Sequence, residues 1–144
     1  MKTKEKAEKL QRKTKTYFIS CIGEDGYPLT KAVLPAKRCT KIYELYFCTN
    51  TSSKFVEAIS KNPKASVYFY SRKMLFVFKG CYLKGYMEIV TDMATKKKYW
   101  SNPYKNAYPE KSYTDPDFSV LRFTPKTGRF YCNFKLSDID FAEA

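Results

Sequence analysis

The chain has 144 residues, 44% of them hydrophobic and 17% aromatic, which fits a single domain over residues 1–144 with a core of its own. No apolar run is long enough to cross a membrane, and the charged first residues lack the apolar stretch of a signal peptide, so we expect a cytoplasmic protein. The net charge of +13 suits a solvated surface with a few lysines left for a phosphate, and the absence of histidine excludes the commonest catalytic base and metal ligand.

The first half of the sequence predicts two helices and three strands. Residues 4–14 are mostly good helix formers, and the segment after them is rich in β-branched and aromatic residues. Asp25-Gly26 is typical of a hairpin turn, and Asn62-Pro63 ends the second helix. The expected elements are a helix at 4–14, strands at 16–22, 29–34 and 42–48, a polar loop at 37–41 and a helix at 55–62.

The second half predicts further strands around one short helix. Gly80 and Gly85 are candidates for a bulge or for a close approach of two backbones. Thr91 or Asp92 caps the helix, and Pro103 ends it. The expected elements are strands at 65–70, 75–79 and 81–90 (the last two alternatively one bent strand), a helix at 93–102, an ordered loop at 104–117, and a hairpin of 118–124 and 129–134 around 125–128. Six to eight short strands with small helices predict a mainly β (α+β) fold, an antiparallel β-barrel with small peripheral helices.

The cysteines are interpreted as reduced residues that fill strands. Their number is odd, and no two have the CxxC spacing of a zinc or redox site. Most of them stand among β-branched and aromatic neighbours, where a free cysteine behaves as a small apolar residue. No disulfide and no metal site is therefore expected at Cys21, Cys39, Cys48, Cys81 or Cys132.

The stretch from Phe47 to Lys54 carries the clearest chemical signal. A strand ends, hydroxyl and amide side chains follow, and a helix begins with a lysine in its first turn. A helix N-terminus presents unpaired N–H groups and a partial positive charge, so this junction predicts an anion site suited to a phosphate. Lys31, on a neighbouring strand, could point at the same anion. The alternative is an ordinary helix cap by Ser52 or Ser53, with Lys31 as an exposed strand residue.

Two aromatic stretches are weaker candidates. Trp100 and the tyrosines within 99–113 could line a cleft for a ring or pack in the core, and packing is the favoured interpretation. Residues 129–131 could touch a ligand from a hairpin, but a core strand is the default interpretation.

The order of these pieces resembles one known family. The landmarks are Asp25-Gly26-Tyr27-Pro28, Lys31-Ala32-Val33, the segment with Phe47, Thr49, Asn50, Ser53 and Lys54, Lys61-Asn62-Pro63, Gly85 with Glu88 and Asp92, Trp100, and Arg122-Phe123-Thr124-Pro125. In this order and spacing, over residues 5–136, the chain resembles the pyridoxamine 5′-phosphate oxidase-like family of FMN-binding split barrels, and within it the general stress protein branch.

The resemblance implies a split β-barrel that forms a homodimer with FMN at the subunit interface. It implies that Lys31, Ser53 and Lys54 hold the phosphate of FMN. The sequence departs from the family at one of these residues and at the position after Lys54. Many relatives have arginine where Lys31 stands, and many have a second basic residue where Phe55 stands. Because lysine is a point charge without the bidentate fork of arginine, a lower affinity for the phosphate is expected.

The resemblance also implies which residues lie along the rest of the cofactor. Thr49 and Asn50 would lie near the ring or the ribityl chain, and Val33 and Phe47 would pack by the isoalloxazine. Backbone groups near Cys48 would reach the polar edge of the ring. The complete set of expected cofactor-binding residues is Lys31, Ala32, Val33, Phe47, Cys48, Thr49, Asn50, Ser53 and Lys54.

The function implied is that of an FMN-dependent oxidoreductase with an unknown small-molecule substrate, and no catalytic residue stands out. True pyridoxamine phosphate oxidation is not expected, because residues 138–144 lack the arginine and histidine of those oxidases and Gly80 stands near the place of an amide residue. One alternative is a flavin-binding sensor or store without turnover. Deazaflavin or haem are alternative cofactors, and the lack of histidine argues against haem. A basic barrel that binds nucleic acid by aromatic stacking ranks below these.

Overall fold

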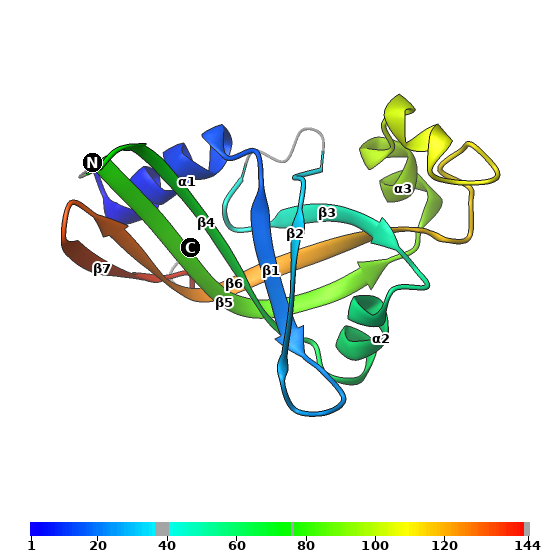
Figure 1. The fold of residues 1–144 in the computed structure, drawn as a ribbon, viewed down its shortest axis with the longest axis horizontal. Helices are drawn as coiled ribbons and strands as arrows, with labels where there is room; N and C mark the ends of the chain where they lie inside the picture. Colours follow the sequence, from blue (N-terminus) through cyan, green and yellow to red (C-terminus); the bar gives the residue numbers. More distant parts are fainter. Residues whose placement is uncertain (37–40, 76, 143–144) are drawn as a thin grey trace.

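The structure is a computed structural model that describes residues 1–36, 41–75 and 77–142. These residues form a seven-stranded antiparallel sheet with helices at its two ends (Figure 1). None of the helices among them is long and apolar enough to cross a membrane. The elements are α1 (Thr3–Lys13), β1 (Tyr17–Ile22), β2 (Pro28–Val33), β3 (Leu45–Asn50), α2 (Lys54–Lys61), β4 (Lys64–Met74), β5 (Val77–Val90), α3 (Met93–Tyr99), the 3₁₀ helix η1 (Asn102–Asn106), β6 (Phe118–Cys132) and β7 (Lys135–Asp140).

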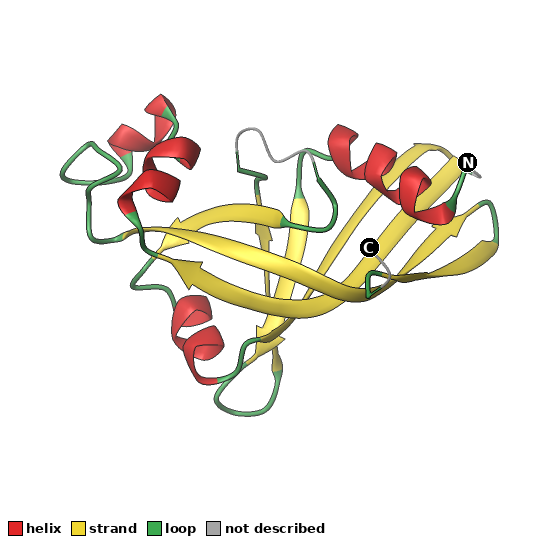
Figure 2. Cartoon of the chain, turned by 180° about the vertical axis from the view of Figure 1, so that it is seen from behind, coloured by secondary structure: helices red, strands yellow, loops and turns green. Residues whose placement is uncertain are grey.

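The strand order closes the sheet into a barrel with a partly open seam. Neighbouring strands follow the order β2-β1-β4-β5-β6-β3, and β7 pairs with the far half of β6. The two end strands meet only briefly: Pro35 forms an isolated bridge with Phe47, and the amide of Ala36 donates to the carbonyl of Tyr46 at 2.9 Å. Figure 2 shows α1 beside the arm formed by β4 to β7, with α2 and α3 at the opposite end. The predicted antiparallel split-barrel fold with small peripheral helices is therefore confirmed.

Two separate cores stabilise this arrangement. Inside the barrel, the ring of Tyr17 packs edge-on against Phe47 and Phe69, with ring centroids 5.4 and 5.3 Å apart. Outside the barrel, a second core joins α3 and η1 to the outer side of β6, and there Trp100 lies 4.9 Å from Phe118 in an edge-on contact. Trp100 and the buried tyrosines near it thus pack in a core, as the favoured interpretation expected.

Two predicted boundaries were wrong because turns replace regular structure. The strand expected at 42–48 begins at Leu45, since residues 41–44 form a turn in which the amide of Glu44 donates to the carbonyl of Lys41. The helix expected at 93–102 ends at Tyr99, and Pro103 instead lies in the first turn of η1. The predicted cap by Asp92 is confirmed, since its carboxylate accepts from the amide of Thr95 at 2.9 Å. The expected loop at 37–41 falls mostly outside the described residues, and so does Cys39.

The hairpin predicted around residues 125–128 was also wrong, because β6 runs straight through them. Proline lacks an N–H group and normally interrupts a central strand. Pro125 is tolerated because it lies where the partner strands change: β3 pairs with β6 only as far as Phe123, and β7 begins to pair at Thr127. The hairpin turn lies instead at Asn133 and Phe134, which both have positive φ.

Gly85 allows β5 and β6 to approach each other at a register shift. It pairs with Pro125, and the pairing shifts between Lys84 and Gly85. A Cβ at position 85 would overlap the carbonyl oxygen of Thr124 and lie 2.8 Å from the Cα of Pro125. The predicted close approach is confirmed, and β5 is the single long strand that the sequence left as an alternative.

Candidate functional site

The side chain of Lys31 spans the open seam between β2 and β3. Its backbone pairs with Ile19, whose side chain is in the barrel core, so Lys31 points to the inner side of the sheet. Its Nζ donates to Oγ1 of Thr49 on β3 at 2.7 Å and lies 5.1 Å from the centre of the Phe55 ring on α2. Lys31 therefore brings together β2, the end of β3 and the start of α2.

The charge of Lys31 has no acidic partner in the part of the chain that the structure describes. The ion pairs there involve other residues, and the Thr49 hydroxyl is a neutral acceptor. Burial lowers the pKa of Lys31, and the nearby Cys21 thiol opposes this shift to a smaller extent. A half-buried ammonium group carries three donors, and a nearby anion would stabilise its charged form.

The β3–α2 junction is an ordinary helix cap that leaves further donors free. Ser53 has an extended backbone, and its Oγ accepts from the amide of Val56 at 3.2 Å, so the capping interpretation is confirmed. The first two helical amides, those of Lys54 and Phe55, donate to no acceptor among the described contacts. Capping and anion binding are thus compatible here, because a cap satisfies only part of the N-terminal donors of a helix.

Contacts from a distant loop hold the end of β3 in place. The hydroxyl of Tyr108 donates to Oδ1 of Asn50 at 2.9 Å and lies 3.3 Å from the carbonyl oxygen of Thr49. Asp117 accepts from the amide of Ser52 at 2.8 Å. Burial is the main reason why the pKa of Tyr108 is raised to about 12, so this hydroxyl remains a donor at neutral pH. The sequence analysis missed Tyr108 as part of this site, since nothing in its local pattern pairs it with Asn50.

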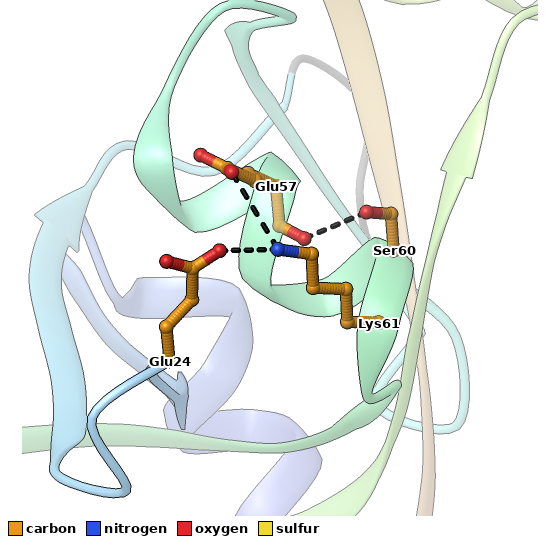
Figure 3. A network of polar contacts seen from close by, with 4 residues as sticks. All are labelled: Glu24, Glu57, Ser60 and Lys61. Atoms are coloured by element: carbon orange, nitrogen blue, oxygen red, sulfur yellow. Dashed lines mark hydrogen bonds and ion pairs between the residues drawn. The ribbon is translucent and has the colours of Figure 1, made fainter.

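The far end of α2 is tied to the β1–β2 turn. Figure 3 shows Lys61, in the last turn of α2, between the carboxylates of Glu24 and Glu57, the second at 3.7 Å. The hydroxyl of Ser60 donates to the carbonyl of Glu57 at 2.6 Å. These side chains are exposed, so the network contributes little to the free energy of folding. It links the end of α2 to the turn that leads into β2. The hydrogen bond and the charge of Lys61 are the main reasons why the pKa of Glu24 is lowered, and the charge of Lys54, which lies exposed at the start of the helix, adds the least.

The side chains of four other predicted residues do not join this cluster. Phe47 is fully buried in the barrel core, and Val33 is half-buried against the same core. The Cys48 thiol faces the second core, where it lies 3.6 Å from the carbonyl oxygen of Tyr99, and burial raises its pKa to about 12. Ala32 is exposed on the outer side of the sheet, opposite to Lys31. Contacts of these residues with a cofactor stay predictions.

A comparison with protein families shows to which family the chain belongs. A family model described as pyridoxamine 5′-phosphate oxidase matches residues 3–132. The chain belongs to the pyridoxamine 5′-phosphate oxidase family. Among curated proteins, no match to the chain is found.

Solved structures with the same fold include a relative that is more than 30% identical. A protein from Clostridium acetobutylicum, described as related to general stress protein 26 of B. subtilis, is 31% identical, with a TM-score of 0.82 and coverage of 97% of this chain and 95% of that one. General stress protein 26 from Bacillus anthracis is 22% identical, with a TM-score of 0.76 and coverage of 96% and 100%. A heme binding protein from Mycobacterium smegmatis is 13% identical, with a TM-score of 0.78, over 97% of this chain and 58% of that one. The resemblance to the general stress protein branch of the family is thereby confirmed.

The side chain of Lys31 is half-buried at the seam. Three hollows of about 800, 580 and 460 Å³ lie elsewhere on the molecule, and none of them is lined by a predicted cofactor-binding residue.

Proposed function

We propose that this protein binds FMN and holds its phosphate at the seam between β2, β3 and α2. The observation that carries the proposal is the half-buried Lys31, which has no acidic partner in the described chain and lies 5.1 Å from the ring of Phe55, in the first turn of α2. The first two amides of this helix have no acceptor among the described contacts. Lys31, Ser53 and Lys54 would hold the phosphate by charge and hydrogen bonds, as anions are held at other helix N-termini. These donors fit a phosphate monoester, which has several acceptor oxygens and carries negative charge at neutral pH.

The proposed activity is that of a flavin-dependent oxidoreductase with an unknown small-molecule substrate. Bound FMN would supply hydride transfer, and the chain would position it and tune its electronics. Thr49 and Asn50 are held by Lys31 and Tyr108, so they present fixed polar groups next to the phosphate donors. Family membership supports a flavin, and the general stress protein neighbours support a role outside pyridoxamine phosphate oxidation. We also place the protein in the cytoplasm and regard nucleic acid as an unlikely partner.

A homodimer with the flavin at the subunit interface is part of this proposal. The outer side of β4, β5 and β6 carries Tyr68, Phe78, Tyr82 and Tyr131, which we call the aromatic face, around a hollow of about 460 Å³. Large contiguous apolar patches on a soluble protein mark interaction sites. At the centre of this face, a side chain on Gly80 would meet the hydroxyl of Tyr68 at 2.7 Å, so Tyr68 fills the space next to this glycine. A second copy of the chain on this face would bury these four aromatic rings.

The test is to purify the protein, record its visible spectrum, identify any bound cofactor by mass, and titrate the apoprotein with FMN while following flavin fluorescence. A yellow protein, or quenching of FMN fluorescence at a one-to-one ratio, supports the proposal. A colourless protein that leaves the fluorescence unchanged overturns it, and a haem spectrum would replace flavin by haem. Steady NAD(P)H consumption with an added acceptor separates an oxidoreductase from a flavin store.

The pH dependence of binding follows from the lowered pKa of Lys31. Only the protonated amine attracts the phosphate, and burial makes Lys31 lose its proton at a lower pH than an ordinary lysine. We therefore expect the affinity for FMN to fall as the pH rises, beginning below the range in which exposed lysines titrate. Riboflavin, which lacks the phosphate, should not show this loss. Parallel fluorescence titrations of both flavins between pH 7 and pH 10 check the prediction, and identical profiles would contradict it.

A further inference from the structure

A second basic site lies between α1 and the arm of the sheet that extends past β1 (Figure 1). It is a hollow of about 800 Å³, which we call the lysine groove. Its size is within the usual range for sites of small molecules and cofactors. It shares no lining residue with the Lys31 seam. The lysines that line it are Lys6, Lys9, Lys13, Lys15, Lys73 and Lys79.

The positive charge of the lysine groove is not neutralised by the protein. No aspartate or glutamate lines it, and among the described residues none of its six lysines forms an ion pair. Lys6, Lys9 and Lys13 recur at helical spacing on one face of α1, and Glu8 is paired instead with Arg12. Like charges on concave walls raise the local potential, so a multiply charged anion would be attracted strongly.

The lysine groove also has an apolar floor and a flat aromatic pair at its margin. Leu10 of α1 and Phe130 of β6 form buried parts of the floor. The rings of Phe18 and Tyr70 stack with centroids 6.3 Å apart and an angle of 15° between planes, and the two residues are 36% and 47% exposed. Flat, half-exposed rings that line the same hollow as the lysines suit a planar aromatic group that is attached to phosphates.

We propose that the lysine groove binds a nucleotide with two or more phosphates. The base would lie against Phe18 and Tyr70, and the phosphates would lie among the lysines of α1, β4 and β5. A single phosphate would neutralise only a small part of six positive charges, whereas a triphosphate supplies up to four negative ones. A lipid surface is disfavoured because the site is concave and walled by α1. The lysines of the groove are different from the residues of the Lys31 seam, so FMN binding should not depend on these lysines. Tyr70 also stacks on Tyr68 and Phe78 of the aromatic face, so the oligomeric state of a Tyr70 variant has to be checked.

The test is calorimetric titration of the full chain at low salt with ATP, AMP and inorganic tripolyphosphate. ATP should bind most tightly, because it alone combines a base with three phosphates, and its affinity should fall steeply as salt is added. The variant with Lys9→Gln and Lys13→Gln should bind ATP about tenfold more weakly, because it loses two of the six charges that attract the phosphates. The control with Lys97→Gln and Lys105→Gln removes the same charge from exposed sites on α3 and η1 and should change the affinity less than twofold.

Further measurements separate this proposal from the alternative explanations. Tyr70→Leu should weaken the binding of ATP but not the binding of tripolyphosphate. The particle mass of this variant in solution should equal that of the wild type. Equal losses in the two double variants would overturn the proposal, because they would show attraction by net charge alone. Binding of a short single-stranded oligonucleotide without binding of ATP would overturn it in favour of nucleic acid. Unchanged FMN binding in the Lys9→Gln and Lys13→Gln variant is expected, and its loss would contradict the expectation that FMN binding does not depend on these lysines.

Discussion

Replacing Lys31 by methionine should weaken FMN binding by about 1–3 kcal/mol, which corresponds to roughly a 5- to 150-fold higher Kd. Methionine keeps an unbranched apolar stem, so the packing against Phe55 is largely retained while the charge is lost. The effect is large because Lys31 is half-buried and its attraction to a phosphate is little screened by water. Lys54→Ala should have an effect at the lower end of the same range, since Lys54 is exposed. Fluorescence titration with FMN measures both values.

Two controls make this prediction specific to the phosphate. Riboflavin should bind the wild type and the Lys31→Met variant with affinities that differ by less than about twofold, because it lacks the group that Lys31 would hold. Lys64→Ala removes an exposed lysine at the start of β4 and should leave FMN affinity unchanged. Wild-type affinity for FMN in both the Lys31 and the Lys54 variants would show that the phosphate lies elsewhere.

The sequence predicted the helix cap of the site correctly, because the residues that form a cap are neighbours in the sequence. The helix cap depends on Ser53 and the residues directly after it, and hydroxyl residues before an amphipathic helix are a strong signal. The contact between Lys31 and Thr49 depends instead on how the barrel closes, since among the described residues the segment after β2 meets β3 at one isolated bridge, between Pro35 and Phe47. The hydrogen bond from Tyr108 to Asn50 likewise joins residues far apart in the sequence. Propensity and spacing carry no information about such pairings.

The course of β6 shows the same limit for the fold. Pro125 and Gly128 within one short segment are typical of a turn, and the local pattern favoured a hairpin there. The neighbouring strands keep this segment extended. One edge of β6 changes partner from β3 to β7 at Pro125, and the other edge pairs with Gly85 of β5. Tertiary pairing therefore overrides turn chemistry in this segment.

The alternation along β3 determines the role of Phe47. Leu45, Phe47 and Thr49 alternate with more exposed residues, so all three face the inside of the barrel. Phe47→Ala should lower the free energy of unfolding by about 3–5 kcal/mol, because it leaves a cavity against Tyr17 in a fully buried site. This is a large part of the 5–15 kcal/mol by which domains are usually stable. Urea unfolding followed by circular dichroism measures the loss, and Tyr27→Ala, at a position 73% exposed, should change it by less than about 0.5 kcal/mol.

A milder substitution separates packing in the core from contact with the flavin ring. Phe47→Leu keeps much of the buried volume, so it should fold with a loss of roughly 1–2 kcal/mol. If Phe47 acts only through the core, the folded variant binds FMN as the wild type does, and Thr49, on the same inward side of β3, still receives the hydrogen bond from Lys31. A loss of FMN affinity larger than that of Lys31→Met, in protein that is fully folded, would instead place Phe47 against the isoalloxazine. The two variants thus distinguish a site built on the Lys31 charge from one built on contacts with the ring.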